Sequence, residues 1–359
     1  MSDATGPSAF TGWPVVLSQL FRREDLSSGL AEATFDAILS GEAKPVQIAA
    51  LVAALKTKGE TVEEITGFVK AMRRAGERVE LNVDAIDTCG TGGDRSTTIN
   101  VSTSAAFVAV GAGAVVAKHG GRAASSQSGS ADVLEALGVV IELGPEEVKR
   151  CIESVGIGFC FAPRFHPAMR FVAPVRSELG VPTIFNILGP LANPAGVTRQ
   201  VIGVGDPSMA EKMLGVLEAF GSHHAIVCYG NDGLDELSTV TSSTIFESSL
   251  SSNGTRIRRS YQLDPRGFDL EPATLADLRG GTAAHNAERL RAVLAGERGA
   301  QRDIVLLNAA AALVVANIAT DIAEGLTLSE QSIDSGLALA ALEHLIALSQ
   351  ELGAVSSRA

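Results

Sequence analysis

Aromatic residues, cysteines and basic side chains are all scarce in this sequence, and each shortage excludes a class of protein. Aromatic residues make up 4% of the 359 residues, which disfavours an aromatic-lined cleft. Lys and Arg number 29 against 41 Asp and Glu, a net charge of −12, so the chain lacks the basic balance typical of non-specific nucleic-acid binding. The cysteines have neither CxxC pairing nor a metal-binding spacing with histidine, which predicts reduced thiols. They are Cys89, Cys151, Cys160 and Cys228.

Targeting and membrane-spanning segments are also not evident. The N-terminus has no basic region followed by an apolar stretch, as a signal peptide would. The most apolar segment, residues 304–319, is too short to cross a bilayer and contains Asn308 and Asn317, so we expect a buried helix there. We therefore expect a cytoplasmic protein without membrane contact. The 46% hydrophobic content is enough for a large core and rules out disorder as the main architecture.

The apolar periodicity changes near residue 84, which predicts two domains. Before it, helical spacing covers residues 31–39, 45–56 and 62–74, and Thr61 with Glu64 forms a capping box for the third helix. After it, short apolar runs alternate with helices, which predicts an α/β fold with a mainly parallel sheet. The predicted strands are 85–88, 114–117, 139–143, 158–161, 183–185, 201–204 and 225–229. The predicted helices between them are 102–111, 131–137, 146–154, 167–179 and 209–220. A polar hairpin excursion is expected at 244–247 and 257–261. The expected domains are 1–84, helical, and 85–359, α/β.

A glycine-rich loop at residues 90–93 follows the first predicted strand and precedes a helix that begins near Ser102. Glycines there let backbone N–H groups approach an anion, and the helix N-terminus adds a positive dipole. The loop has neither the Gly-Lys-Ser/Thr ending of a P-loop nor the GxGxxG order of a dinucleotide fold. A tight structural turn also requires glycine, so this loop alone favours phosphate binding without establishing it. Hydroxyl groups that could contact phosphate or Mg²⁺ belong to Thr91, Thr98, Ser102 and Thr103.

A second loop of the same kind, residues 118–130, follows the next strand, and Lys118 and Arg122 add positive charge to it. Ser130 could cap the following helix and also bind phosphate. Because both loops follow strands of one parallel sheet, they are expected to converge on one crevice.

Two further features carry charge that could contact a ligand. Asp235 and Glu236 are adjacent in a loop after a strand, where such pairs are usually solvated, but beside a polyphosphate they would bind Mg²⁺. Arg176 lies on a predicted helix, where an ion pair is the commoner role, although guanidinium is the side chain best suited to a carboxylate.

Six segments together resemble the anthranilate phosphoribosyltransferase family, over nearly the whole chain. They are DTCGTGGD at 87–94, NVST at 100–103, KHGGRAASSQSGSADVLEALG at 118–138, RFHPAMR at 164–170, FNILGPLANP at 185–194 and GLDELS at 233–238. The resemblance implies a small helical domain, with residues 167–179 packed against it, and a large α/β domain of the nucleoside phosphorylase/phosphoribosyltransferase type. It also implies a homodimer formed through the helical domains.

The resemblance implies Mg²⁺-dependent transfer of the phosphoribosyl group of 5-phosphoribosyl 1-diphosphate (PRPP) to the amine of anthranilate, with two Mg²⁺ ions. The matching metal positions are Ser102, Asp235 and Glu236, and Arg176 with Gly90 matches the anthranilate pocket. The positions expected around PRPP are Gly90, Gly93, Asp94, Thr98, Asn100, Val101, Ser102, Thr103, Lys118, His119, Gly120, Gly121, Arg122, Ala123, Ala124, Ser125, Ser126 and Ser130. His119 is either catalytic or holds its loop in place by hydrogen bonds.

One position departs from the family pattern. The family's second loop has asparagine after KHG, where this chain has Gly121. The missing amide puts the acceptor in question more than PRPP, so an alternative is the same transfer to another aromatic amine or acid. A nucleoside phosphorylase fits two phosphate loops and an acidic pair less well. A non-catalytic nucleic-acid-binding relative would be expected to lose the GTGGD loop and gain basic charge, and this chain does neither.

Overall fold

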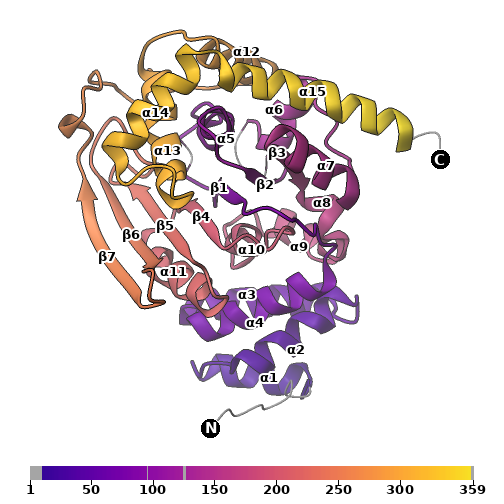
Figure 1. Ribbon diagram of the computed structural model, residues 1–359. Coiled ribbons are helices and arrows are strands. Elements are labelled where there is room, and N and C mark those ends of the chain that lie inside the picture. The colour runs from indigo at the N-terminus through magenta and orange to yellow at the C-terminus, as the bar shows by residue number, and fades with distance from the viewer. Residues whose placement is uncertain (1–9, 95, 124–126, 357–359) are drawn as a thin grey trace.

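A central β-sheet separates a helical region at the N-terminus from a second group of helices that covers its other face (Figure 1). The structure is a computed structural model, and it describes residues 10–94, 96–123 and 127–356. Within these residues the strands form one seven-stranded sheet in the order β3-β2-β1-β4-β5-β6-β7. The strands are β1 (Ile86–Gly90), β2 (Val116–Gly120), β3 (Ile157–Phe161), β4 (Arg199–Gly203), β5 (His224–Gly230), β6 (Ser243–Leu250) and β7 (Arg256–Leu263).

The N-terminal region consists of α1 (Trp13–Phe21), α2 (Ser28–Leu39), α3 (Pro45–Lys58) and α4 (Val62–Ala75). The predicted helices at 31–39, 45–56 and 62–74 are confirmed. The predicted capping box is present as well: the Thr61 hydroxyl accepts from the Glu64 N–H, and the Glu64 carboxylate accepts from the Thr61 N–H. Helix α1 was not predicted, and it buries Trp13, Val16 and Leu20.

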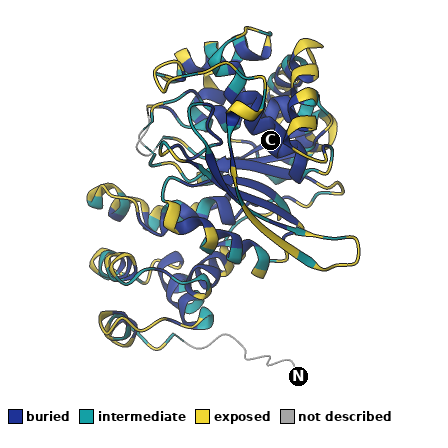
Figure 2. Ribbon diagram, turned by 90° about the vertical axis from the view of Figure 1, so that its left-hand side faces the viewer, coloured by how far each residue is buried: buried dark blue, intermediate teal, exposed yellow. Residues whose placement is uncertain are grey.

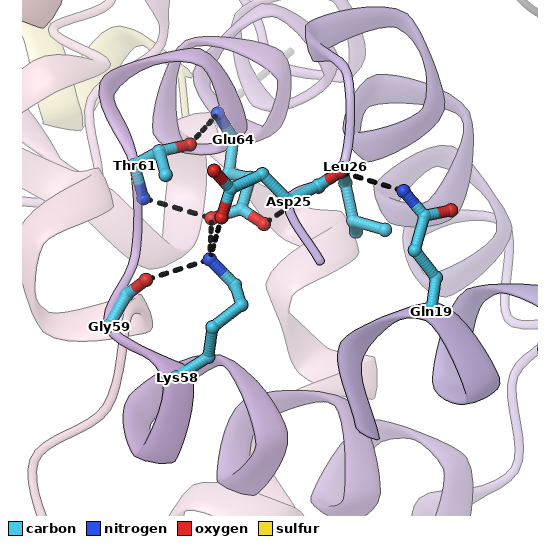
Figure 3. Close-up of polar contacts among 7 residues, drawn as sticks. All are labelled: Gln19, Asp25, Leu26, Lys58, Gly59, Thr61 and Glu64. Carbon is cyan, nitrogen blue, oxygen red and sulfur yellow. Dashed lines mark hydrogen bonds and ion pairs between the residues drawn. The ribbon is translucent and has the colours of Figure 1, made fainter. Parts of the chain in front are cut away.

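Glu64 also joins three segments of the helical region (Figure 3). Its carboxylate, fully buried, accepts from Leu26 N at 2.9 Å and pairs with Lys58 Nζ at 3.0 Å. The same ammonium group donates to Asp25 at 2.6 Å and to Gly59 O at 2.8 Å. Each oxygen of this buried carboxylate therefore has a donor, as a stable buried charge requires.

Two clusters of buried hydrophobic residues pack on opposite faces of the sheet. Val201 of β4 and Ile226 of β5 contribute to the cluster beneath the later helices, whereas their neighbours Ile202 and Val227 contribute to the cluster shared with α1–α4. This alternation follows from the two-residue period of a strand. Figure 2 shows the strands buried between the helical layers, with exposure increasing toward one edge.

The remaining helices lie on one or other face of this sheet. They are α5 (Val101–Gly111), α6 (Ser130–Ala136), α7 (Pro145–Val155), α8 (Ala162–Phe165), α9 (Ala173–Leu179), α10 (Phe185–Leu191), α11 (Ala210–Ala219), α12 (Ala283–Leu294), α13 (Ala300–Val315), α14 (Ile322–Asp334) and α15 (Leu337–Ser356). Helices α5 and α13 pack on each other, and α9 contacts α3, so residues around 176 do pack against the helical region. The segment expected to be a buried helix is α13.

Strand pairing confirms the mainly parallel sheet and corrects the sequence prediction at its edge. Strands β3, β2, β1, β4 and β5 are parallel, whereas β6 and β7 are antiparallel. The residues expected to form a separate hairpin excursion are therefore part of the main sheet. The strand β7 at the edge carries exposed arginines, a usual device against edge-to-edge pairing.

Three predicted elements are wrong. Residues 139–143 form no strand, because β3 already occupies the place beside β2 and the segment instead packs its alternate residues on the core. Residues 183–185 lead into α10, and the Asn186 side chain accepts from Thr183 N at 3.1 Å as that helix begins. The helix expected at 167–179 is divided into a 3₁₀ turn (Pro167–Phe171) and α9, which starts afresh around Pro174.

Helix α15 is the one helix in the described part of the chain that is long and apolar enough to cross a membrane, over Leu337–Val355. It packs along α5 and α7 and buries Leu342 and Leu345 in the core. Its length and composition are therefore weak evidence that it crosses a membrane, because the core helix of a folded protein has the same features.

Candidate active site

A cavity of about 340 Å³ lies where the loops after β1, β2 and β5 meet α9 and α10. It is lined by parts of both glycine-rich loops together with Arg176, Asp235 and Glu236. The two loops predicted to share one crevice do so. This is the carboxyl end of the parallel strands, where open α/β sheets place their ligands.

The first loop depends on glycine at three positions. Gly92 and Gly93 have φ values of 69° and 85°, which other residues rarely adopt. At Gly90 a Cβ atom would lie 2.2 Å from Asp235 Oδ2, so only glycine permits the approach of that carboxylate. Gly92 N donates to the same oxygen at 2.7 Å. The loop is therefore shaped around Asp235.

Three carboxylates gather on one side of the cavity. Asp235 is 9% exposed, and burial together with the charges of Asp94 and Glu236 raises its pKa well above the ordinary range. Burial raises the pKa of Glu236 to about 8, although the charge of Lys118 opposes this effect. Asp235 is buried and Glu236 is half-buried, so neither is fully solvated, as adjacent carboxylates in a loop usually are. Buried acids with too little compensating charge are common at functional sites.

The start of α5 meets these carboxylates. Ser102 N donates to Glu236 Oε1 at 3.2 Å. Lys118 is buried, and its ammonium group donates to Thr88 O at 2.6 Å and approaches Ser102 Oγ at 3.4 Å. Asp87, also fully buried, accepts from His119 N and from the Asn193 side chain. The positive charge of Lys118 is thus held within the carboxyl ends of β1 and β2.

The second loop is held by an acidic side chain that sequence reasoning did not single out. Asp132 accepts from Ala123 N at 2.9 Å and from Gly129 N at 2.8 Å. The Arg122 guanidinium pairs with Asp132 and Glu135, so its charge is already compensated. Ser130 Oγ lies near Gly121 O, at 3.5 Å. Ala124, Ser125 and Ser126, which the family resemblance places at PRPP, lie outside the described residues.

Asn286 was also missed, since α12 is 186 residues along the chain from Asn100 and has no motif of its own. Its amide donates to Asn100 Oδ1 at 2.8 Å and to Ser128 Oγ at 2.9 Å. It thereby connects the first helical turn after one loop to the other loop. Thr98 and Val101 lie on the same side, and Thr103 is buried behind them.

An unpaired cation also lines the cavity. The Arg176 side chain makes no hydrogen bond or ion pair with any described residue, and burial lowers its pKa. At Gly121 a Cβ atom would meet only the Ala162 methyl group, at 3.9 Å, so a side chain would fit there. An anion of modest size can therefore approach Arg176 without displacing a protein partner.

His119 lines the same cavity and is 4% exposed. Its Nδ1 is 2.9 Å from Gly189 O, whereas its Nε2 has no partner in the structure. Because a carbonyl only accepts, Nδ1 carries the proton and Nε2 presents a lone pair. Burial, followed by the neighbouring His166 and Lys118, lowers the pKa of His119 to about 3. The ring is therefore neutral at physiological pH and a weak base.

The donors of this site suit Mg²⁺. Asp235, Glu236 and the Ser102 hydroxyl offer hard oxygen ligands, and the two carboxylates lack sufficient positive charge nearby. Within the described ranges, no three His, Cys, Asp or Glu side chains are arranged to hold a metal by themselves.

Comparison with known proteins assigns the class that this fold and site define. Residues 82–339 match the model described as "glycosyl transferase family, a/b domain", and residues 14–76 match the helical bundle domain of the same family. The protein is therefore a member of this glycosyl transferase family. Both halves of the structure are covered.

The relatives narrow the class. The anthranilate phosphoribosyltransferase of Rubrobacter xylanophilus is 52% identical over 92% of this chain and 95% of its own length. That of Thermomicrobium roseum is 52% identical over 94% of this chain and 97% of its own. The crystal structure of the Thermus thermophilus enzyme superimposes with a TM-score of 0.86 at 41% identity, over 93% of this chain and 99% of that one. The chain belongs to the anthranilate phosphoribosyltransferase family.

One solved relative was captured with ligands. The Saccharomyces cerevisiae anthranilate phosphoribosyltransferase in complex with PRPP and Mg has a TM-score of 0.86 and 30% identity over 98% of this chain and 99% of its own.

Proposed function

We propose that this protein transfers the 5-phosphoribosyl group of PRPP to the amine of anthranilate, which gives N-(5-phosphoribosyl)anthranilate and diphosphate in tryptophan biosynthesis. The observation that carries the proposal is the set of charged groups that line one cavity. Asp235 and Glu236 lie beside the glycine-rich loop, and the unpaired Arg176 lines the same cavity. A diphosphate with Mg²⁺ complements the two acids, and an aromatic carboxylate complements the arginine.

The PRPP side is assigned to the two loops and the start of α5. Backbone N–H groups around Gly93 and Asn100 to Thr103 would bind phosphate oxygens, as would groups of the second loop from Lys118 to Ser130. The first Mg²⁺ would be held at Ser102 and the second at Asp235 and Glu236. Bound Mg²⁺ would neutralise negative charge on the departing diphosphate. The proposal is supported by the family match and by the PRPP and Mg named for the yeast relative.

The reaction needs positioning more than a strong base. The bond between C1 of the ribose and the diphosphate oxygen breaks, the amine nitrogen bonds to C1, and the amine gives up one proton. Arg176 would hold the carboxylate so that the amine faces C1. His119 either accepts that proton at Nε2 or holds its loop through Gly189 O, and its low pKa favours positioning.

A homodimer through the helical region is part of the proposal. Val15, Phe21 and Val46 of α1 and α3 are at least half exposed, and exposed apolar side chains on these two helices suit a protein interface. We place the protein in the cytoplasm, with no nucleic-acid partner, in accord with its net charge of −12.

Anthranilate fluorescence tests the activity directly. The protein is mixed with PRPP, MgCl₂ and anthranilate, and loss of fluorescence is followed, with omission of PRPP and addition of EDTA as controls. PRPP- and Mg²⁺-dependent loss is expected. If anthranilate is not consumed while another aromatic amine or acid releases diphosphate, that other compound is the acceptor. The open space at Gly121 then accounts for the change of substrate.

A further inference from the structure

A second cavity, of about 500 Å³, lies between the helical region and the sheet, on the other side of the first glycine-rich loop from the active site. Gly92 and Gly93 line both cavities, as does Asn186. Its volume falls in the range of small-molecule sites. We call it the Glu60 pocket, after the residue that gives it its chemistry.

Glu60 is a buried acid without a hydrogen-bond donor. It is 5% exposed, it lines the pocket, and its side chain makes no hydrogen bond or ion pair with any described residue. Its carboxylate oxygens remain accessible, so they open into the pocket, where a ligand can bring the donor that the protein does not supply. The buried Glu64 nearby has three donors, so lack of donors is a property of this position and not of the region.

The backbone holds Glu60 in place. On one side Gly59 O accepts from Lys58 Nζ, and on the other Thr61 N donates to Glu64 (Figure 3). The residues that flank Glu60 are therefore fixed by a buried network, and the carboxylate is preorganised toward the pocket.

A second polar atom in the pocket is also unsatisfied. Thr183 is 9% exposed and lines the pocket, and its Oγ1 is buried without a hydrogen-bond partner among the described residues. A hydroxyl can donate or accept, so it complements a further polar atom of a ligand.

The charged rim of the pocket leaves one negative charge to be balanced. Lys56 pairs with Asp206 at 3.0 Å, and both are about half exposed. The hydrogen bond to Asp206 and, less strongly, the charge of Glu60 raise the pKa of Lys56. Because the ammonium group of Lys56 already donates to Asp206, that pair is neutral overall, and the charge of Glu60 remains for a ligand.

The rest of the wall fixes the class of ligand. The pocket has an apolar surface, which is supplied by Val181, Ile184, Ile187 and Met209. We propose that the Glu60 pocket binds a small ammonium compound with an apolar body. The ammonium group donates to Glu60, and the body lies against Ile184 and Met209. The pocket shares Gly93 with the positions expected around PRPP, but Glu60, Ile184 and Met209 do not line the active-site cavity, and the proposal does not depend on the proposed reaction.

The test uses 2-phenylethylamine as the probe on the full-length protein, by isothermal titration and by NMR of methyl-labelled Ile and Met. A probe of this size is expected to bind with a dissociation constant on the order of 1 mM. Shifts should concentrate on Ile184, Ile187 and Met209. The anion 3-phenylpropanoate, of similar shape, should not produce them.

Glu60→Gln should weaken binding of the amine by about tenfold or more, because a charge-assisted hydrogen bond is lost. Thr183→Val tests the second polar contact, and a few-fold loss is expected. The matched control is Glu63→Gln, which removes the same charge from an exposed position on α4 and should leave binding unchanged.

Three results would overturn the proposal: no shifts at Ile184, Ile187 and Met209 in the wild-type protein, equal shifts with the anion, or equal affinity in Glu60→Gln. The wild-type NMR measurement stands even if a variant fails to fold. Because it needs neither PRPP nor turnover, it is independent of the phosphoribosyl transfer experiment.

Discussion

Two acidic sites in this protein differ in how far their charge is compensated. Glu64, within the helical region, has a donor for each oxygen and a lysine beside it. Asp235 and Glu236 lie among like charges that include Asp94, and Lys118 is the nearby cation that opposes the rise in the Glu236 pKa. The compensated acid is expected to stabilise the fold, and the undercompensated pair to be destabilising until a ligand arrives. The donors and cations around an acidic side chain therefore separate an acid that stabilises the fold from one that awaits a ligand.

The largest effect is expected on breaking the compensated site. Glu64→Ala leaves Lys58 buried without its full set of partners and removes the acceptor of Leu26 N and Thr61 N. It should lower the free energy of unfolding by about 3–5 kcal/mol. Urea denaturation measures this. At a temperature where the variant is folded, the turnover number should remain near wild type, and a selective loss of turnover would contradict the division drawn above.

Neutralising Asp235 and Glu236 should have the opposite effects, so that turnover falls while stability does not. Asp235→Asn with Glu236→Gln retains shape but loses charge, so turnover should fall by about a hundredfold or more. The melting temperature without Mg²⁺ should stay level or rise, since two carboxyl groups whose ionisation is disfavoured by burial and nearby like charge are gone. Steady-state rates over a range of Mg²⁺ concentrations and a melting curve are needed. A near-normal rate at every Mg²⁺ concentration would remove these residues from the site.

Arg176 is the cationic counterpart, a half-buried group without a protein partner among the described residues. Arg176→Ala should raise the KM for anthranilate by roughly ten- to a hundredfold, because a charge-assisted pair contributes about 1.5–3 kcal/mol. The KM for PRPP should change little. Arg170→Ala, which removes an arginine that lies over Phe171, is the control.

A substitution at Gly121 tests the same cavity by adding a polar group instead of removing a charged one. Gly121→Asn introduces an amide where only the Ala162 methyl group is close, and a neutral hydrogen bond is worth about 0.5–1.5 kcal/mol. The KM for anthranilate should therefore fall by no more than about tenfold. If turnover with anthranilate appears only in the variant, the natural acceptor is another molecule.

The smallest change is expected at His119, which has one satisfied nitrogen and one free nitrogen. In His119→Asn the amide can still donate to Gly189 O, so turnover should fall only a few-fold, and complete loss in folded protein would make Nε2 the proton acceptor. The low folded pKa, about 3, lies below the ordinary value of 6.5. Stability is therefore fully present above pH 6.5 and is lost as the pH falls toward 3, because the unfolded chain binds the proton first. Thermal melts between pH 7 and 4 should show a shallower decline in the variant.

The sequence predicted local structure better than it predicted contacts between separate segments of the chain. The loops after β1 and β2 were found because glycine runs between a strand and a helix have a distinct physical cause. Residues 139–143 alternate as a strand does, but whether they join the sheet depends on the place that β3 occupies. Asn286 contacts Asn100 only because α12 crosses back to the loops, and nothing near it in the sequence predicts that. Arg122 was expected to add positive charge to its loop, and its pairing with Asp132 and Glu135 was not predicted because the turn between them sets their relative positions.

The residues of β4 and β5 alternate between two hydrophobic clusters, and this alternation affects how the protein unfolds. Val201 and Ile202 are consecutive, yet each supports a different cluster. The helical region has no apolar interior that belongs to it alone, because part of its wall is the sheet. The two sequence-defined domains therefore form one cooperative unit: melting the helices exposes one face of β4 and β5, and fraying those strands loosens both layers at once.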